Sequence, residues 1–562
     1  MFKIMNQTNT EKFLNARNFL LKHRLDYEKV AKEFVWPVFH EFNWAREWFD
    51  VYAKNNLSPA LWIKHEDQSE TKISYADLSH RSNQISCYLQ RIGVQRGDKL
   101  IVLLSNLVPL WELMLAAIKI GAIIVPTSTL ATKSELIDRI QRSGAKFIFT
   151  EQACVEKISD DTGIVRVLCQ GKEHEYLNYE EGYNENGNYR IVQTKAADPL
   201  FLYFTSGTTS LPKLVQHTHQ SYPVGHFSTM YWIGIQEGDI HQNISSPGWA
   251  KHAWSSFFAP FNAGATVFIY EYTRFNARNE LCILNEIGVN TLCVPPTVWR
   301  MMILENLEHK PRNLREIVSA GEPLNPEVIQ KVKDSWGIQI RDGYGQTETT
   351  ALLGNCPGQK IKSGSTGRVL PGCSITLLNH DYHEKQEGEL ALRLNSCPLN
   401  LMNGYIDDQE KTNAVMKNGY YRTGDEASID EDGYFFFFGR RDDVFKSSDY
   451  RISPFELENI LIEHDFIVEA AVVPSPDKLR TNLPKAFVTL KPGVEKKFET
   501  AREILLFAKA KLPPYKRIRK LEFRELPKTI SGKIKRIELR KLEAEHVANN
   551  LKGEFEFFLS DL

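Results

Sequence analysis

A short segment at residues 205–213 combines residue types that can hold a polyphosphate. It reads Thr205-Ser206-Gly207-Thr208-Thr209-Ser210-Leu211-Pro212-Lys213 and follows an apolar run, 200–204, that predicts a buried strand. Hydroxyls and backbone N–H groups can surround phosphate oxygens, Gly207 lets the backbone approach closely, and Lys213 adds a cation. Pro212 stands where the nucleoside-triphosphatase loop needs its second glycine, so the segment is not that loop. The alternative is a polar turn between two strands, and the Pro-Lys end favours the phosphate interpretation.

Two further segments, both after apolar runs, carry groups suited to a nucleotide. They are Ala320-Gly321-Glu322-Pro323 and Asp342-Gly343-Tyr344-Gly345-Gln346-Thr347-Glu348. The first predicts a strand-end turn whose glycine leaves a flat backbone surface for a base. The second follows a predicted strand at 337–340 and offers a ring that can stack, a hydroxyl and a carboxylate suited to Mg²⁺.

Two more segments lie nearer the C-terminus. They are Tyr421-Arg422-Thr423-Gly424-Asp425 and Pro527-Lys528-Thr529-Ile530-Ser531-Gly532-Lys533. The first predicts a carboxylate in a turn, where Asp425 can accept two ribose hydroxyls. The second ends in a lysine on a glycine-containing loop. Each segment alone could be a turn, a capped helix or a solvated lysine, but their order and joint presence are harder to explain in that way.

The elements that must position these segments follow an α/β pattern. Between about 60 and 200, apolar runs at 99–104, 122–126 and 146–150 alternate with helical stretches such as 111–120, which predicts α/β units around a partly parallel sheet. The pattern repeats from about 200 to 370. Here a strand and the phosphate loop are followed by a helix, and then by a strand at 265–270, a helix at 277–287 and a strand at 291–294. Residues 11–55 are helical and aromatic and are expected to pack across this body.

A change of character near residue 440 predicts the domain boundary. Residues 365–440 contain short strands and glycine turns, which predict a β-rich subdomain. After a hairpin at Asp432-Gly433, the chain becomes charged at Gly439-Arg440-Arg441-Asp442-Asp443. Beyond it, helix 454–463 capped by Ser453, strands 468–473 and 485–490, and helices 500–512 and 534–545 predict a compact α+β module. The expected domains are 1–440 and 441–562, and the aromatic tail 555–562 has no assigned role.

Composition narrows the class of protein. A chain of 562 residues is long enough for two to four domains, and its net charge of −1 offers no bulk attraction for nucleic acid or an anionic membrane. The eight cysteines contain no C-x-x-C pair, which favours reduced thiols over a disulfide framework or a zinc site. No secretory h-region and no run of about 18 apolar residues occurs. We therefore expect a soluble, cytoplasmic enzyme with no membrane span.

Taken together, the five segments resemble the acyl-adenylate-forming superfamily of acyl-CoA synthetases, luciferases and peptide-synthetase adenylation domains. The resemblance runs from about residue 60 to 545. Gly-Gln-Thr-Glu at 345–348 and Ser-Gly-Lys-Ile at 531–534 look like the short- and medium-chain acyl-CoA synthetases. The resemblance implies a large N-terminal domain of two α/β halves plus the β-rich subdomain, with a small mobile α+β C-terminal domain. It also implies an acid–thiol ligase that makes acyl-AMP and pyrophosphate from ATP and transfers the acyl group to CoA, with Mg²⁺ as cofactor.

Carried over residue by residue, the resemblance implies an ATP site. Its members are Thr205, Ser206, Gly207, Thr208, Thr209, Ser210, Leu211, Pro212, Lys213, Gly321, Glu322, Pro323, Asp342, Gly343, Tyr344, Gly345, Gln346, Thr347, Asp425, Arg440 and Lys533. The 205–213 loop would hold the β- and γ-phosphates, residues 321–323 and Tyr344 would enclose the adenine, and Asp425 would bind the ribose.

The same resemblance implies three catalytic residues. Thr347 would contact the acyl carboxylate or the α-phosphate, Glu348 would hold Mg²⁺, and Lys533 would bridge the acyl carboxylate and the departing phosphate. Asp442 matches the hinge about which the C-terminal module turns between the two half-reactions.

The residues implied for CoA are Ser448, Asp449, Tyr450, Arg480, Arg517 and Arg519. The basic residues suit the phosphates of CoA, although a solvated strand edge is an equal alternative for the run 516–520. Two positions depart from the family pattern, Ser210 and Asp449, each of which stands where glycine is usual. Asp449 could crowd the pantetheine arm, which leaves open transfer to a carrier-protein thiol instead of CoA. A non-catalytic adenylate-binding protein is a further alternative, and the intact lysines and carboxylates disfavour it.

The acyl substrate is assigned to Trp249, Gly345, Thr347 and Arg451. Acetate-specific relatives have a tryptophan where this chain has Gly345, so its absence implies room for a longer, branched or aromatic acid. Trp249 resembles a tryptophan that lines the acyl tunnel of medium-chain relatives, with a core tryptophan as the alternative. Because a methylene changes selectivity by only about 1–3 kcal/mol, sequence does not specify which short- to medium-chain acid is used.

Overall fold

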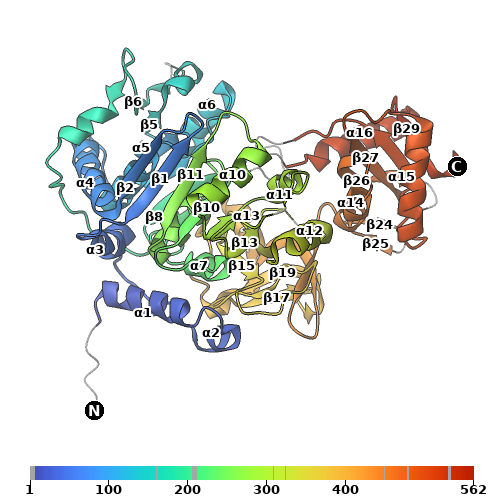
Figure 1. Ribbon diagram of the computed structural model, residues 1–562, viewed down its shortest axis with the longest axis horizontal. Coiled ribbons are helices and arrows are strands. Elements are labelled where there is room, and N and C mark those ends of the chain that lie inside the picture. Colours follow the sequence, from blue (N-terminus) through green and yellow to red (C-terminus); the bar gives the residue numbers. More distant parts are fainter. Residues whose placement is uncertain are drawn as a thin grey trace. The chain divides into compact units, whose positions relative to one another are not determined.

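The computed structural model describes residues 7–159, 162–205, 212–307, 309–322, 324–448, 450–477, 480–528 and 533–561. These fall into two compact units (Figure 1). The first comprises Met1–Ile375, Leu392–Tyr420 and Asp432–Phe435, and the second comprises Thr376–Ala391, Tyr421–Glu431 and Phe436–Leu562. Within the described residues, no helix is both long and apolar enough to cross a membrane.

A nine-stranded sheet forms one half of the first unit. Its order is β16-β15-β14-β13-β12-β10-β11-β1-β2. The strands are β1 (Pro59–His65), β2 (Glu70–Ser74), β10 (Ile240–Asn243), β11 (Thr266–Glu271), β12 (Thr291–Cys293), β13 (Glu316–Ser319), β14 (Arg341–Gly345), β15 (Ala351–Gly354) and β16 (Arg368–Val369). The strands from β14 to β1 are parallel, and antiparallel strands close both edges. Helices α10 (Ala277–Ile287), α11 (Pro296–Met302) and α12 (Pro326–Trp336) contribute apolar side chains to its core.

An eight-stranded sheet forms the other half. Its order is β20-β9-β8-β4-β3-β5-β6-β7. The strands are β3 (Lys99–Leu103), β4 (Ile123–Pro126), β5 (Phe147–Thr150), β6 (Val165–Leu168), β7 (Leu177–Asn178), β8 (Pro199–Thr205), β9 (Lys213–Thr218) and β20 (Gly404–Tyr405). The accompanying helices are α4 (Tyr75–Arg91), α5 (Val108–Ile120), α6 (Lys133–Ser143) and α13 (Gln409–Val415). Strands β4 and β5 are buried at every position, as expected for parallel strands covered on both faces. The predicted α/β class with two sheet halves is confirmed.

The connection between the sheets is helical. Its elements are α7 (Phe227–Ile233), α8 (Ala250–Ala253), the π-helical turn Trp254–Phe258 and α9 (Ala259–Ala263). The N-terminal segment contains α1 (Asn9–Lys22), α2 (Tyr27–Glu33) and α3 (Asp50–Ala53). The Arg17 Nε donates to the carbonyl of Asn262 at 2.7 Å, and the Trp44 Nε1 donates to the Asn262 side-chain oxygen at 2.8 Å. The expectation that this segment packs across the main body is confirmed.

The predicted β-rich region contains a six-stranded sheet. Its core order is β18-β17-β19-β22-β21, with β23 paired to β22. The strands are β17 (Ile375–Leu378), β18 (Glu384–Lys385), β19 (Glu387–Arg393), β21 (Met416–Lys417), β22 (Tyr420–Ile429) and β23 (Phe435–Arg440). The Asp432-Gly433 turn joins β22 to β23, as the sequence predicts.

Three local expectations are wrong. A strand, β9, follows the 205–213 segment where a helix is expected, because buried Leu214 and Val215 and the pairing with β8 favour an extended chain. Asp425 lies within the ten-residue strand β22 and not in a turn. The strand predicted at 337–340 instead begins at Arg341, so β14 includes the first residues of the 342–348 motif.

The second unit contains a four-stranded sheet of order β26-β27-β28-β29. Its elements are β24 (Phe445–Ser447), β25 (Tyr450–Ile452), α14 (Pro454–Ile462), β26 (Ile467–Asp477), β27 (Thr481–Leu490), α15 (Phe498–Lys511), β28 (Lys520–Phe523), α16 (Arg536–Ala548) and β29 (Glu556–Phe558). Ala470 and Val472 of β26 share one apolar cluster with α14 and α15, whereas Ala471 and Val473 share another with α16. This period-two alternation places helices on both faces.

The aromatic tail has a structural role. Strand β29 pairs antiparallel with β28 at the sheet edge, and Phe557 lies 5.6 Å from Phe523 between ring centroids. The ammonium of fully buried Lys485 lies 2.9 Å from the Glu556 carboxylate and 2.8 Å from that of Glu522, and it also contacts Glu543 of α16. A buried cation is tolerated when it is surrounded by such partners. The tail and α16 are thereby attached to the same side chain.

A buried carboxyl on α10 provides a test of this packing. Burial raises the pKa of Glu280 from 4.5 to about 7, and Gln242 donates to one of its oxygens. Within the part of the chain that the structure describes, the other Glu280 oxygen and the Gln242 side-chain oxygen have no hydrogen-bond partner. As the pH rises from 4.5 to 7, the unfolded chain loses a proton that Glu280 keeps in the folded chain. The contribution of Glu280 to the free energy of unfolding therefore falls across this pH range and stays constant above it.

Glu280→Gln should therefore stabilise the first unit by about 3 kcal/mol at pH 8, since the shift is about 2.5 units at 1.36 kcal/mol each. The gain should shrink toward pH 5, where the native carboxyl is protonated. Urea unfolding at the two pH values measures it, with exposed Glu305→Gln as the control. A gain that does not depend on pH would contradict the buried-carboxyl explanation.

Candidate active site

The 205–213 segment joins two paired strands. Thr205 ends β8 and lies opposite Lys213, the first residue of β9, so both ends of the segment are adjacent in the ladder. Arg142 of α6 donates to the carbonyl of Pro212 at 2.6 Å and contacts Asp407. Residues Ser206, Gly207, Thr208, Thr209, Ser210 and Leu211 lie outside the described residues. The described ends have a lysine and an arginine beside them, which suits an anionic ligand.

Lys213 and Glu348 are connected through Tyr405. The Lys213 Nζ donates to the Tyr405 hydroxyl at 3.4 Å, and that hydroxyl donates to the Glu348 Oε1 at 2.9 Å. Tyr405 reaches this position because β20 pairs with β9, with Tyr405 opposite Val215. Among the described residues, Glu348 Oε2 has no hydrogen-bond partner. The structure thus brings a predicted phosphate-binding cation and a predicted metal ligand into one connected group.

The turn that carries Thr347 is held by a buried histidine. His217 Nε2 lies 2.7 Å from the Thr347 carbonyl, and burial lowers the pKa of His217 to about 4. The ring is therefore neutral near pH 7, and Nε2 carries the hydrogen because a carbonyl can only accept. The Gln346 N–H donates to the Thr349 hydroxyl at 3.0 Å. These bonds fix the backbone on either side of Thr347.

The two segments predicted to enclose adenine leave adjacent parallel strands. Val318 of β13 lies opposite Arg341 of β14, so Gly321 and Tyr344 follow at the same sheet edge. Gly321 has a φ of +108°, which favours glycine, and a Cβ there would meet no atom of a described residue within 4 Å. Glu322 lies 3.6 Å from Arg300, and Tyr344 is half-buried. Pro323 lies outside the described residues.

Two residues of the predicted ATP site serve packing in this structure. A Cβ on Gly343 would lie 2.4 Å from the Trp232 ring, so glycine is required there by a close approach. Asp342 is buried, and its carboxylate accepts from the Gly343 N–H at 3.0 Å. Burial raises the pKa of Asp342 well above its ordinary value. Because Gly343 has no side chain and the Asp342 carboxylate is buried, the backbone is the part of this segment that a nucleotide could most easily reach.

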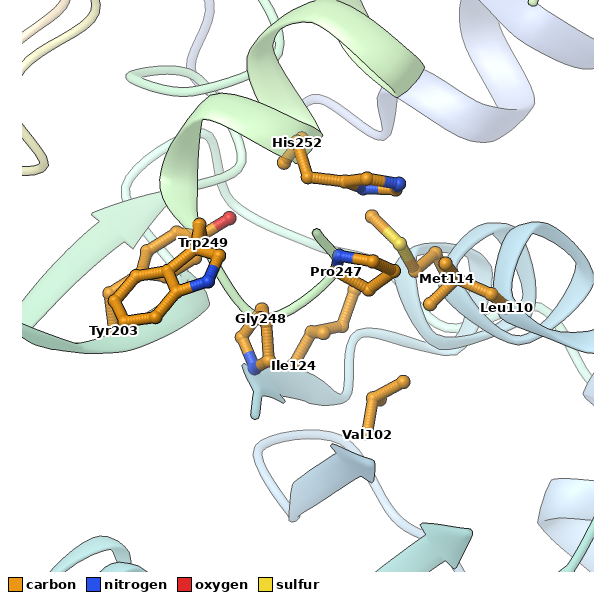
Figure 2. Close-up of a pocket in the computed structure, with 11 residues that line it drawn as sticks. Val102, Leu110, Met114, Ile124, Tyr203, Pro247, Gly248, Trp249 and His252 are labelled. Atoms are coloured by element: carbon orange, nitrogen blue, oxygen red, sulfur yellow. The ribbon is translucent and has the colours of Figure 1, made fainter. Parts of the chain in front are cut away.

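A small apolar cavity surrounds Trp249 (Figure 2). It lies where β3, β4 and β8 end, beside the loop that precedes α8, and its cavity volume is about 10 Å³. Figure 2 shows Trp249 and Tyr203 at one end, Leu110 and Met114 at the other, and His252 along one side. Ligands of α/β proteins bind at the carboxyl ends of such strands. The position therefore suits the end of an acyl chain, and its size suits a short one.

The room expected beside Gly345 is filled. A Cβ on Gly345 would lie 2.6 Å from the Trp254 ring and 2.4 Å from the Thr350 carbonyl oxygen. The Trp254 Nε1 donates to the Tyr222 hydroxyl at 2.9 Å, which holds the indole in this place. The expectation of extra space for a longer chain is wrong on this side, because a tryptophan from elsewhere in the chain occupies it.

In the second unit, Asp425 and Arg440 form a pair. Arg440 Nη1 lies 3.3 Å from Asp425 Oδ1, and Asp425 is almost completely buried. The Thr423 hydroxyl accepts from the Asp425 N–H at 3.1 Å. Gly424, between Thr423 and Asp425, has a φ of +76°, which favours glycine. The residue predicted to bind the ribose and the arginine predicted near it in the ATP site are therefore neighbours.

The predicted hinge and the predicted catalytic lysine are both connected to helix α16. Arg540 of α16 donates to the Asp442 carbonyl and lies 3.0 Å from the Asp443 carboxylate. Lys533 is exposed and lies just before α16. A bridge between Lys528 and Ile534 and a 2.8 Å bond from Lys535 N–H to the Pro527 carbonyl close the base of its loop. Thus α16 begins just after the predicted catalytic lysine and contacts the predicted hinge residue through Arg540.

The residues predicted for CoA gather on one part of the second unit. Burial lowers the pKa of Arg519, and the charges of Arg480 and Arg517 lower it further, so the three guanidinium groups are close. The Ser448 N–H donates to the Arg480 carbonyl at 2.7 Å, and Tyr450 stacks on Tyr515 at 4.4 Å. Clustered arginines suit phosphate groups. Asp449 lies outside the described residues, and for Arg451 the backbone alone is described, in the β24–β25 pair.

Sequence reasoning missed Tyr405, His217 and Arg142. Tyr405 and His217 each stand alone among ordinary strand residues, and Arg142 looks like a solvated helix residue. Tyr405 is 57 residues from Glu348, and His217 is 130 residues from Thr347. No local signal in the sequence could have identified them.

Comparison with known proteins places these features in one family. The family model of the AMP-binding enzyme matches residues 52–406, and that of the AMP-binding enzyme C-terminal domain matches residues 456–533. The chain is 41% identical to 4-hydroxybutyrate–CoA ligase 1 of Metallosphaera sedula over 96% of this chain and 98% of that protein. It is 36% identical to the mitochondrial acyl-coenzyme A synthetase ACSM3 of Rattus norvegicus over 92% of this chain and 93% of that protein.

The fold agrees. The anthranilate CoA ligase AuaEII, solved with anthranoyl-AMP, superposes with a TM-score of 0.82 at 26% identity over 92% of this chain and 99% of its own. The Brucella canis acyl-CoA synthetase superposes with a TM-score of 0.71 at 32% identity, over 94% and 99% of the two chains. Both the family models and these full-length relatives lead to the same conclusion: this chain belongs to the AMP-binding enzyme family.

Proposed function

We propose that this protein is an AMP-forming acid–CoA ligase. It activates a short- to medium-chain carboxylic acid as acyl-AMP with release of pyrophosphate, and then transfers the acyl group to CoA. The observation that carries this proposal is the connected group of Lys213, Tyr405 and Glu348 beside the carboxyl end of β8. The full-length similarity to an acyl-CoA synthetase and a CoA ligase supports it.

The first half-reaction must bring two anions together. A carboxylate is a poor electrophile, and its attack on the α-phosphate of ATP produces a mixed anhydride with a good leaving group. Lys213 and Arg142 supply positive charge at the ends of the 205–213 segment, which we assign to the β- and γ-phosphates. Such preorganised charge accounts for much of the rate enhancement of enzymes.

A magnesium ion fits this site. Glu348 offers a carboxylate oxygen with no partner among the described residues, and oxygen ligands are those that Mg²⁺ prefers. Tyr405 would orient the carboxylate through its 2.9 Å hydrogen bond. When bound, the ion would neutralise phosphate charge, while Thr347, held by His217, contacts the acyl carboxylate or the α-phosphate.

The second half-reaction needs a different arrangement. We assign residues 441–562 to a C-terminal domain that turns about Asp442, so that Lys533 serves adenylation and the arginine cluster at 480, 517 and 519 serves CoA. Asp425 and Arg440 are assigned to the ribose. Movements of this kind are common between steps that need different catalytic groups.

Exchange of labelled pyrophosphate into ATP, screened over carboxylic acids, tests the proposal. Exchange that depends on an acid is expected, followed by acyl-CoA formation when CoA is added. Exchange without any acyl-CoA, but with transfer to a phosphopantetheinylated carrier protein, would overturn the CoA assignment and leave adenylation standing. Absence of exchange with every acid would overturn the whole proposal.

Trp254 should limit the length of the acid. Trp254→Leu removes the ring that lies 2.6 Å from the Cβ position of Gly345, so acids longer by two to four carbons should gain at least tenfold in kcat/KM relative to the preferred short acid. The exchange assay over straight-chain acids measures it. Trp336→Leu, a buried tryptophan of another cluster, should lower stability without moving the length profile. An unchanged profile in Trp254→Leu would place the acyl chain elsewhere.

A further inference from the structure

Besides the indole of half-buried Trp249, the cavity around this residue contains two polar groups in an otherwise apolar lining. They are the imidazole of His252 and the hydroxyl of Tyr203 (Figure 2). Both side chains are almost completely buried, with 3% and 2% of their surface exposed. A buried polar group without a partner is costly, so such groups indicate a ligand that completes their hydrogen bonds.

The protonation of His252 follows from its neighbours. Its Nε2 lies 3.0 Å from the Asn106 Oδ1, which can only accept, so Nε2 carries the hydrogen. Asn106 in turn donates to Glu271, whose pKa burial raises to about 7. Burial lowers the pKa of His252 to about 3, so the ring is neutral at physiological pH. Its Nδ1 is then an acceptor.

That acceptor has no partner within the described part of the chain. No hydrogen bond joins Nδ1 to another described residue, and Nδ1 is not among the buried atoms that packing seals off completely, as both nitrogens of His219 are. The Tyr203 hydroxyl is completely buried beside the Tyr222 hydroxyl, with which it interacts, but it makes no hydrogen bond of normal geometry to a described residue. The residues that line the small cavity thus include an imidazole with an available acceptor nitrogen and a tyrosine whose hydroxyl is fully buried beside it.

These groups match an alcohol better than a methyl group. A hydroxyl can donate to His252 Nδ1 and accept from Tyr203, whereas a methyl group leaves both unpaired. A site built to bond a hydroxyl rejects the analogue that lacks it far more strongly than an apolar pocket rejects a methylene. The volume of about 10 Å³ holds roughly one water-sized group.

We infer that the acid activated by this enzyme is a short hydroxy acid, whose hydroxyl at the far end of the chain bonds to His252 and Tyr203. The inference rests on the proposed ligase function and deepens it. The relative from Metallosphaera sedula is named as a ligase for a hydroxy acid of this kind, which agrees with the chemistry of the cavity.

Matched pairs of acids test the inference with the full-length enzyme. Each hydroxy acid is compared with the acid in which methyl replaces hydroxyl: 3-hydroxypropionate with butyrate, 4-hydroxybutyrate with pentanoate, and 5-hydroxypentanoate with hexanoate. Pyrophosphate exchange should favour the hydroxy acid of the best pair by at least tenfold in kcat/KM. Equal use of both members of every pair would overturn the inference and leave the ligase standing, whereas no exchange with any acid would overturn both.

Two variants connect the preference to these residues. His252→Leu should lower kcat/KM for the hydroxy acid by at least tenfold and keep or raise it for the methyl analogue. Tyr203→Phe, which keeps the ring, should reduce the preference in the same direction even if the leucine variant folds poorly. Tyr231→Phe removes an equally buried hydroxyl of α7, which has no hydrogen-bond partner among the described residues, and should leave the preference unchanged. A preference that survives Tyr203→Phe and His252→Leu would contradict the assignment.

Discussion

Replacing Lys533 by alanine should lower acyl-adenylate formation by about 10²–10³-fold, the usual cost of removing one group that stabilises developing charge. Lys533 is exposed on a loop whose base is closed by the Lys528–Ile534 bridge, so truncating its side chain should leave the fold intact. The thioester half-reaction, measured with synthetic acyl-AMP and CoA, should stay within a few-fold of the parent, because the proposed role of Lys533 ends with adenylation.

The control for this experiment is Lys535→Ala. Lys535 is two residues away and forms an exposed pair with Glu538 at 2.9 Å, which contributes little to stability. It should retain both half-reactions. Equal loss of both half-reactions in Lys533→Ala would indicate a general defect of the second unit and contradict a role confined to the first step.

Replacing Glu348 by glutamine should lower adenylation by about 10²–10³-fold and raise the Mg²⁺ concentration needed for half-maximal exchange. The amide keeps the size of the side chain, and its oxygen can still accept from Tyr405, so the change removes charge with little effect on packing. A Mg²⁺ titration of the exchange rate measures the effect.

Tyr405→Phe provides the graded comparison for the metal site. It removes the 2.9 Å hydrogen bond to Glu348 but leaves the carboxylate charge, so its effect on the Mg²⁺ requirement should be smaller than that of Glu348→Gln. An unchanged Mg²⁺ requirement in Glu348→Gln would exclude this carboxylate as the metal ligand.

Local patterns predicted much of the fold. Continuous apolar runs became the buried strands β3, β4 and β5, and helix 277–287 is α10 with the expected bounds. Ser453 caps α14 by accepting from the Glu456 N–H, as expected. These predictions succeed because caps and periodicity act within one turn or one strand.

The wrong predictions concern features that depend on contacts between residues far apart in the chain. Strand β9 and the strand position of Asp425 depend on pairing with β8 and with the other strands of the six-stranded sheet, and pairing energy is not visible in a single segment. The predicted space beside Gly345 is absent for the same reason, because Trp254 occupies it from a position 91 residues earlier in the chain.

The sequence by itself determined the kind of chemistry, because a hydroxyl-rich loop, a carboxylate motif and a lysine loop in this order specify groups that act on a nucleotide and an acid. The tertiary structure alone decided which side chains complete them. Tyr405 meets Glu348, and His252 meets Asn106 across 146 residues, because strands and helices far apart in the chain end at the same sheet edge. Substrate selectivity depends on such contacts, since a cavity is formed by packing and not by any one segment.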